Sequence, residues 1–185
     1  NHDKSEHKQK IAAENNQETF GNLSSLLKCF EVAKKDQSDL IYFVEDDYLH
    51  YEHSLVDMLN TYERVSSQHK DEIIVCPSDY PFNYMNNEKT NILIGSQQHW
   101  RTITKMLCTF MISKKMFQKH IENFEKTCEK RHEPFEKYLN KILESEIGIS
   151  PIKSLAIHMT NVNSSYGLSP FIDIKKLWEE NKIRQ

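Results

Sequence analysis

Three consecutive acids follow directly on an apolar run, and their chemistry suits them to binding a cation. Residues 40–44 read Leu-Ile-Tyr-Phe-Val, and Glu45, Asp46 and Asp47 come next. Adjacent carboxylates repel one another, so holding them at the end of a buried strand costs free energy unless a cation compensates them. Hard cations such as Mg²⁺ bind carboxylate oxygens together with substrate phosphates. The stretch therefore predicts nucleotide-dependent chemistry at a divalent metal.

Side-chain alternation along extended backbone predicts which of these acids act together. If strand geometry continues through the triplet, Glu45 and Asp47 point to one side and Asp46 to the other. In a simpler interpretation the acids only cap the next helix or lie in a turn, where acids are common. The apolar lead-in favours the metal site. A zinc site of Asp47 with His50 and His53 is a weaker alternative, because the sequence offers no second pair of closely spaced ligands.

The segments that must position the acids read as strands and helices in alternation. Hydrophobic periodicity and capping residues predict helices over 22–35, 54–67, 113–128 and 134–147, and extended segments over 40–44, 72–77, 92–94, 101–112 and 155–160. Gly148 is expected to stop the last of these helices. Such alternation is typical of a three-layer α/β domain, in which ligands bind at the carboxyl ends of strands. The acid triplet follows such an end.

Length and composition predict one α/β domain over 21–185, preceded by a polar arm over 1–20. The net charge of -3 and the scattered Lys and Arg give no reason to expect a nucleic-acid partner. The four cysteines are widely spaced and predict reduced, mostly buried thiols. No transmembrane segment or signal peptide is recognisable, so we expect a cytoplasmic protein, with peripheral membrane association left open. The chain does not begin with methionine, which suggests that further residues precede it.

Beyond residue 20, most of the chain resembles nucleotide-sugar glycosyltransferases of the GT-A fold. Their DxD-type motif corresponds to Glu45-Asp46-Asp47. The other segments that carry the resemblance, in order, are Gly21-Asn22, Asp39, the run 41–50, His99-Trp100-Arg101-Thr102, 106–112, Pro134-Phe135-Glu136, Ser150-Pro151, His158 and Leu168-Ser169-Pro170. The resemblance implies an α/β/α sandwich with a mixed, mainly parallel sheet. The first nucleotide-binding strand of that fold should precede Gly21, and the polar opening of this chain does not resemble it.

The resemblance also implies roles for particular side chains. Asp47 and His158 match the positions that bind Mn²⁺ or Mg²⁺ together with the sugar-nucleotide diphosphate. Glu45 and Asp46 would contact metal-bound water or nucleotide hydroxyls, and the sequence does not distinguish which of them has which role. Glu136 is the candidate general base for an inverting transfer, with Glu133 as a weaker substitute and a first-turn helix acid as the structural alternative.

Two further sets of residues are candidates for contacts with the substrates. Trp100 and Arg101 would lie beside the sugar or the diphosphate, since arginine matches phosphate oxygens bidentately; the alternative is core packing of Trp100 with a surface Arg101. His158 has a structural alternative as well, as a histidine whose hydrogen bonds are satisfied internally. Acceptor contacts are expected from 80–84 and 166–178, which combine aromatic and turn residues.

The function predicted from these residues and the resemblance is metal-dependent transfer of a sugar from a nucleotide-sugar donor to a glycan or another acceptor hydroxyl. Two alternatives remain. One is a GT-A-like binding protein that has lost turnover, which the missing opening strand suggests. The other is a metal-dependent phosphohydrolase, because clustered carboxylates also serve metal-activated water.

Overall fold

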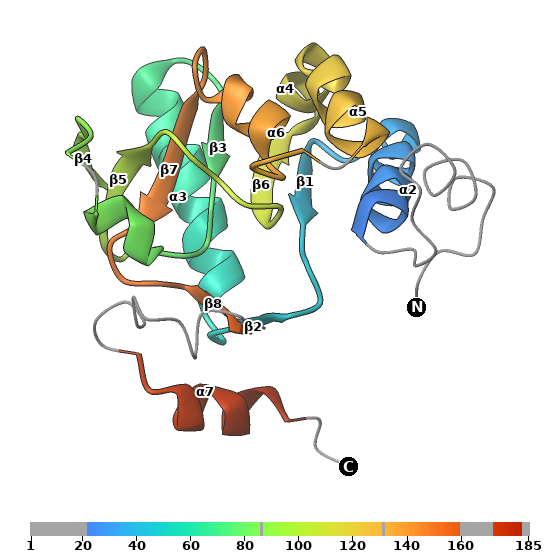
Figure 1. The fold of residues 1–185 in the computed structure, drawn as a ribbon. Helices are drawn as coiled ribbons and strands as arrows, with labels where there is room; N and C mark the ends of the chain where they lie inside the picture. Colours follow the sequence, from blue (N-terminus) through green and yellow to red (C-terminus); the bar gives the residue numbers. More distant parts are fainter. Residues whose placement is uncertain (1–21, 86, 131, 160–171, 183–185) are drawn as a thin grey trace.

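A mixed sheet between two helical layers forms the body of the molecule (Figure 1). The computed structural model describes residues 22–85, 87–130, 132–159 and 172–182. The strands of the six-stranded sheet, in spatial order, are β1 (Leu40–Phe43), β6 (Phe110–Ser113), β3 (Ile73–Val75), β7 (Ile147–Pro151), β5 (His99–Ile103) and β4 (Ile92–Ile94). The described helices are α2 (Asn22–Lys35), α3 (Ser54–His69), α4 (Lys114–Lys119), α5 (Ile121–Glu129), α6 (Lys137–Ile142) and α7 (Ile174–Asn181).

Strand pairing confirms a mixed sheet and shows that the prediction of a mainly parallel one was wrong. Among the described strands, β3 and β7 pair in parallel, and the other neighbours pair antiparallel. A parallel pair needs a long crossover, whereas an antiparallel pair can be joined by a short turn. Residues 95–98 make such a turn, because Ile94 pairs with His99 on either side of it. Alternation of strands and helices along the chain therefore did not translate into parallel pairing.

The side chains of β3 show why the domain has three layers. Ile74 belongs to a core with residues of α2, α4, α5 and α6, whereas Ile73 and Val75 belong to a second core with residues of α3. Successive strand residues point to opposite faces of a sheet. A strand that is apolar at every position is therefore buried on both faces, and the three-layer prediction is confirmed.

An aromatic cluster in the first core anchors the end of β1 that leads to the acids. The rings of Phe30, Phe43 and Phe124 pack with centroids 5.1–6.4 Å apart. Phe110 lies opposite Phe43 in the β1–β6 ladder, and Phe117 of α4 completes the group. Each of these side chains is buried, and such aromatic pairs each add about 0.5–1.5 kcal/mol beyond area burial. The backbone just before Glu45 is thus firmly held.

Helix α3 buries a different face from the one its apolar residues predict. The sequence suggests a buried face of Leu55, Met58, Leu59 and Tyr62. Met58 is fully buried, but Leu55 is 50% exposed and Leu59 is 39% exposed. Asp57 and Thr61 are buried instead, because they accept hydrogen bonds from the backbone N–H groups of Gln97 (3.2 Å) and Ser96 (2.9 Å). Two polar residues fasten α3 to the turn between β4 and β5.

Two other helix predictions differ from the structure in their ends. Ser113 caps α4 as expected, accepting from the N–H of Met116 at 3.0 Å, but the helix breaks at His120 before α5 begins. Gly148 does not stop a helix; it lies within β7. A Cβ at this glycine would lie 2.5 Å from Cδ2 of Leu143, the residue that ends α6, so the Leu143 side chain would have to shift to admit it.

Gly95 is a sensitive position in the core, and we expect Gly95→Ala to be strongly destabilising. An added Cβ would lie 2.2 Å from Cδ1 and Nε1 of Trp100, whose side chain is fully buried. Overpacking of this kind typically costs about 1–3 kcal/mol. Gly148→Ala is the comparison, because its closest neighbour is the flexible end of Leu143. Urea unfolding should show the larger loss for Gly95→Ala; equal losses would contradict the rigid placement of Trp100.

Glu146 makes folding stability depend on pH. Burial raises the pKa of its carboxyl, but hydrogen bonds from Lys119 (2.7 Å) and His120 (2.6 Å) outweigh that effect, so the pKa is lowered on folding. A group whose pKa is lowered stabilises the fold above its unfolded value and loses this contribution as pH falls through the folded value. We expect Glu146→Gln to lower the melting temperature at pH 7 by about 2–4 °C, with a smaller loss near pH 3. An equal loss at both pH values would exclude this ionic role.

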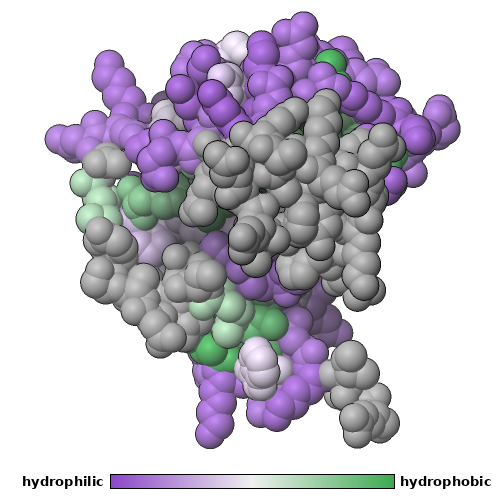
Figure 2. Space-filling view, turned by 45° about the vertical axis from the view of Figure 1, so that its right-hand side comes forward, coloured by the Kyte–Doolittle hydropathy of each residue, from purple (hydrophilic) through white to green (hydrophobic). Residues whose placement is uncertain are grey.

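The described residues contain no disulfide and no helix that is long and apolar enough to cross a membrane. Cys76, Cys108 and Cys128 are buried free thiols, and Cys29 is a free thiol near the surface. The prediction of reduced, mostly buried cysteines is confirmed for this part of the chain. Figure 2 shows that the coloured surface on one side is mostly hydrophilic, with smaller hydrophobic areas.

Candidate metal centre

A small second sheet places the acid triplet beside a histidine from the far end of the chain. Strands β2 (Tyr48–His50) and β8 (Ala156–His158) pair antiparallel, with Tyr48 opposite His158. The backbone N–H of Met159 also donates to the carbonyl of Asp47 at 2.9 Å. The chain between β1 and β2 therefore carries the acids to the place where β8 ends (Figure 1).

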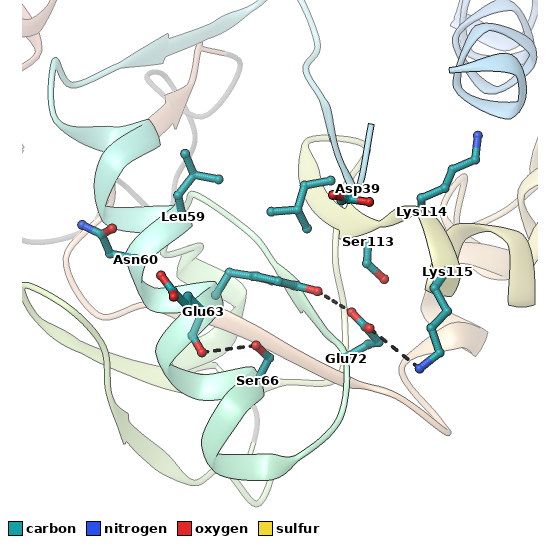
Figure 3. Close-up of a pocket in the computed structure, with 11 residues that line it drawn as sticks. Asp39, Leu59, Asn60, Glu63, Ser66, Glu72, Ser113, Lys114 and Lys115 are labelled. Carbon is teal, nitrogen blue, oxygen red and sulfur yellow. Dashed lines mark hydrogen bonds and ion pairs between the residues drawn. The ribbon is translucent and has the colours of Figure 1, made fainter. Parts of the chain in front are cut away.

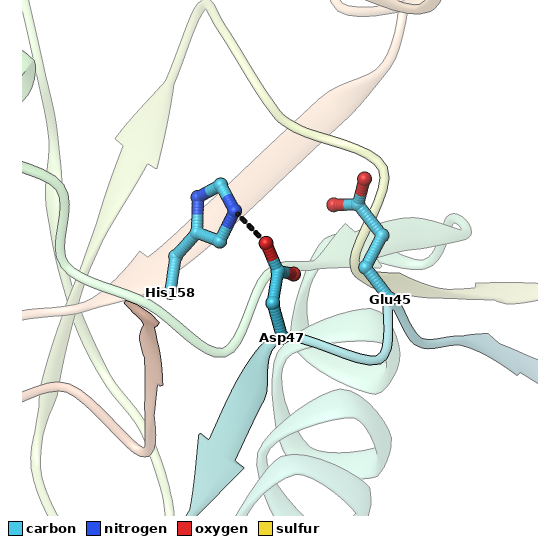
Figure 4. Close-up of side chains that lie close together, drawn as sticks. All are labelled: Glu45, Asp47 and His158. Carbon is cyan, nitrogen blue, oxygen red and sulfur yellow. Dashed lines mark hydrogen bonds and ion pairs between the residues drawn. The ribbon is translucent and has the colours of Figure 1, made fainter. Parts of the chain in front are cut away.

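Glu45, Asp47 and His158 form a compact triad (Figure 4). One ligand atom of each residue lies within 4.8 Å of those of the other two. The imidazole Nε2 of His158 lies 2.9 Å from Oδ2 of Asp47. All three side chains are partly buried. Two carboxylates and one imidazole form a donor set that binds divalent cations such as Mn²⁺.

The acids converge as predicted, but through a turn instead of a continued strand. Strand β1 ends at Phe43, and Asp46 and Asp47 already lie in a turn. Asp46 is exposed and lies outside the triad, while Glu45 and Asp47 face the same space. Glu45 and Asp47 lie together as predicted, although the strand geometry on which that prediction was conditional does not continue through the triplet.

The electrostatics of the triad favour a cation. Burial, followed by the negative charges of Asp47 and Glu136, raises the pKa of Glu45 to about 7. The Oδ1 atom of Asp47 is buried and has no hydrogen-bond partner among the described residues. A divalent ion at this point would offset the repulsion and give that oxygen a ligand bond. The residues present therefore fit a metal, and they would hold it through Glu45, Asp47 and His158.

Two tyrosines support the histidine of the triad. The ring of Tyr48 stacks on the imidazole of His158, with centroids 4.7 Å apart and planes 9° from parallel. The hydroxyl of Tyr48 is hydrogen-bonded to that of Tyr80, and both residues are buried. Sequence reasoning assigned Tyr80 to an acceptor loop and gave Tyr48 no role. The sequence itself carries no signal for this role of Tyr48.

Glu136, the candidate base, lies within electrostatic reach of the triad. It occupies the N-cap position of α6, one residue before the helix begins, and its side chain accepts no capping hydrogen bond from the helix. Burial is the main cause that raises the pKa of its carboxyl, and the charge of His158 opposes the rise. Glu133 is exposed, and its charge raises the pKa of Glu136 slightly further. The structure thus places Glu136 near the triad without including it.

Trp100 and Arg101 do not join the triad. Trp100 is fully buried in the core under α3, which agrees with the packing alternative. Arg101 is buried as well, so it is not the surface residue of that alternative. Its guanidinium lies 3.5 Å from Oδ1 of Asp79 and 4.3 Å from the ring centroid of Tyr84. These contacts fasten the loop 79–85 to β5.

A hollow of about 500 Å³ lies at the other end of β1 (Figure 3). Asp39 and Leu40, at the start of β1, line it together with Tyr62 of α3 and Lys115 of α4. Glu72 accepts from the hydroxyl of Tyr62 and lies 3.8 Å from Nζ of Lys115. No triad residue lines this hollow. This hollow and the candidate metal centre are therefore separate features of the described structure.

Comparison of the chain with protein-family models, curated proteins and solved structures finds no match. The resemblance to GT-A enzymes therefore depends on the sequence motifs alone. Part of the predicted acceptor segment, residues 166–171, and the motif Leu168-Ser169-Pro170 lie outside the described residues, as do the arm 1–20 and Gly21. Trp178 is described; it lies on α7 and is 49% exposed.

Proposed function

We propose that this protein is a metal-dependent glycosyltransferase that moves a sugar from a nucleotide-sugar donor to an acceptor hydroxyl with inversion. The convergence of Glu45, Asp47 and His158 is the observation that carries this proposal. It joins an acid motif in the first third of the chain to a histidine that lies 111 residues after Asp47. GT-A enzymes, which the sequence resembles, use this pairing for a metal and a diphosphate.

The triad would hold Mn²⁺ or Mg²⁺ against the diphosphate of the donor. When bound, a divalent cation neutralises the diphosphate and stabilises the charge that develops on it as the glycosyl bond breaks. The buried Oδ1 of Asp47, which has no hydrogen-bond partner in the described part of the chain, and the raised pKa of Glu45 both agree with a site that needs positive charge. Asp46, which is exposed beside the triad, is free to contact nucleotide hydroxyls in this proposal.

Glu136 would act as the base. The acceptor oxygen attacks the anomeric carbon, its proton passes to the carboxylate of Glu136, and the bond from the sugar to the diphosphate breaks. The nucleoside diphosphate leaves. A carboxylate whose pKa is raised by burial is a better proton acceptor near neutral pH than an exposed one.

The first test is calorimetric titration of the folded protein with nucleoside diphosphates and nucleotide sugars. It should be carried out with Mn²⁺ and repeated with EDTA. We expect binding of one nucleotide class that requires the metal, followed by transfer of the sugar to an added acceptor. Metal-dependent binding without transfer would favour the binding-protein alternative. Release of free phosphate without a glycosylated product would favour a phosphohydrolase, and no binding of metal or nucleotide would overturn the proposal.

A further inference from the structure

The ladder between β1 and β6 ends in a side-chain contact beside the triad. Phe43 lies opposite Phe110 in the antiparallel register. One step further, the backbone N–H of Glu45 donates to the hydroxyl oxygen of Thr109 at 3.0 Å, instead of to a backbone carbonyl. The side chain of the residue just before β6 thus fixes the backbone of the first triad residue as the chain leaves β1.

The surroundings of Thr109 make this contact rigid. Thr109 is fully buried, and Phe110 follows it in the aromatic core. Burial raises the pKa of Glu45, and a hydrogen bond with Thr109 opposes that rise. The same side chain also interacts with the hydroxyl of Tyr48, whose ring stacks on His158. The Thr109 hydroxyl therefore contacts both the backbone of Glu45 and Tyr48, the residue that stacks on His158.

We propose that Thr109 is a positioning residue of the metal centre, and that its hydroxyl fixes Glu45 in the orientation needed to bind a divalent cation. This inference rests on the proposed function, because it assumes that the triad binds a metal. The hydroxyl accepts from the backbone of Glu45 and has its own proton to donate. Partners that orient metal ligands in this way typically change metal affinity 10–100-fold when removed.

The test compares Thr109→Val, which keeps the shape and removes the hydroxyl, with Thr109→Ser, which keeps the hydroxyl. Mn²⁺ affinity is measured from the electron paramagnetic resonance signal of free Mn²⁺, without any nucleotide. We expect Thr109→Val to weaken Mn²⁺ binding about 10–100-fold and Thr109→Ser to bind close to the wild type. Melting temperatures in EDTA report folding separately.

Thr127→Val is the matched control. Thr127 is also fully buried, and its hydroxyl donates to the carbonyl of Asn123 within α5 at 2.9 Å. It should lose stability without losing Mn²⁺ affinity. Unchanged affinity in Thr109→Val would overturn the inference while leaving the proposed function intact, whereas a wild type that binds no Mn²⁺ would overturn both. If Thr109→Val does not fold, Thr109→Ala replaces it. Weakened Mn²⁺ binding in that variant would support the inference, and unchanged binding would overturn it.

Discussion

Asp47→Asn should abolish Mn²⁺ binding and, with it, metal-dependent binding of the nucleotide. Asp47 contributes both oxygens to the centre: Oδ2 contacts His158, and Oδ1 is the buried oxygen without a partner among the described residues. The amide removes one negative charge and offers an N–H₂ group where a cation would bind. Losing a direct ligand should weaken Mn²⁺ binding by more than the roughly 100-fold that loss of a supporting group can cause. Mn²⁺ titration of the purified variant measures this directly.

Glu52→Gln provides the control for net charge. Glu52 is exposed, lies shortly after β2, and is not part of the triad. The Glu52→Gln variant also removes one negative charge close in sequence to the triad. If only Asp47→Asn loses Mn²⁺ affinity, the loss is due to a missing metal ligand and not to the change in net charge. The melting temperature in EDTA should not fall in Asp47→Asn, because removing the negative charge of Asp47 beside Glu45 relieves their repulsion. Wild-type Mn²⁺ affinity in Asp47→Asn would refute the assignment of the triad.

The site was more predictable from sequence than the path of the chain around it. An apolar run followed by acids places Glu45 and Asp47 at a strand end, because few other arrangements bury such a run and still solvate the acids. The role of His158 was predicted only from the resemblance, since spacing alone gives no reason to bring the acids before β2 together with a residue of β8. The partners of Glu45 and His158, Thr109 and Tyr48, could not be predicted, because tertiary contacts decide them.

The errors in the fold have a common physical cause. Apolar periodicity indicates which residues of an element can be buried, but it does not indicate which other element packs against them. Helix α3 packs against the turn 95–98, whose backbone N–H groups donate to Asp57 and Thr61. These two polar residues are therefore buried, and Leu55 is exposed. The direction of strand pairing is likewise set by long-range contacts, and the alternation of elements along the chain does not specify it.

Glu136→Gln should leave metal and nucleotide binding intact while lowering the transfer rate about 10²–10⁴-fold, the usual contribution of a general base. Glutamine keeps the size of the side chain but cannot accept the acceptor proton. The pKa of Glu136 is raised by burial, and only its ionised form is a base. Wild-type turnover should therefore fall as pH falls through this raised value, and that limb of the profile should be missing from the residual activity of the variant.

Two comparisons decide whether Glu136 itself is the base. Glu144→Gln makes the same change beyond the other end of α6, at an exposed position, and should keep wild-type turnover. Glu133→Gln tests the weaker candidate, whose charge raises the pKa of Glu136. Removing that charge should shift the acid limb of the wild-type profile to lower pH and leave the maximum rate nearly unchanged. A large loss of rate in Glu133→Gln, with turnover preserved in Glu136→Gln, would move the base to Glu133.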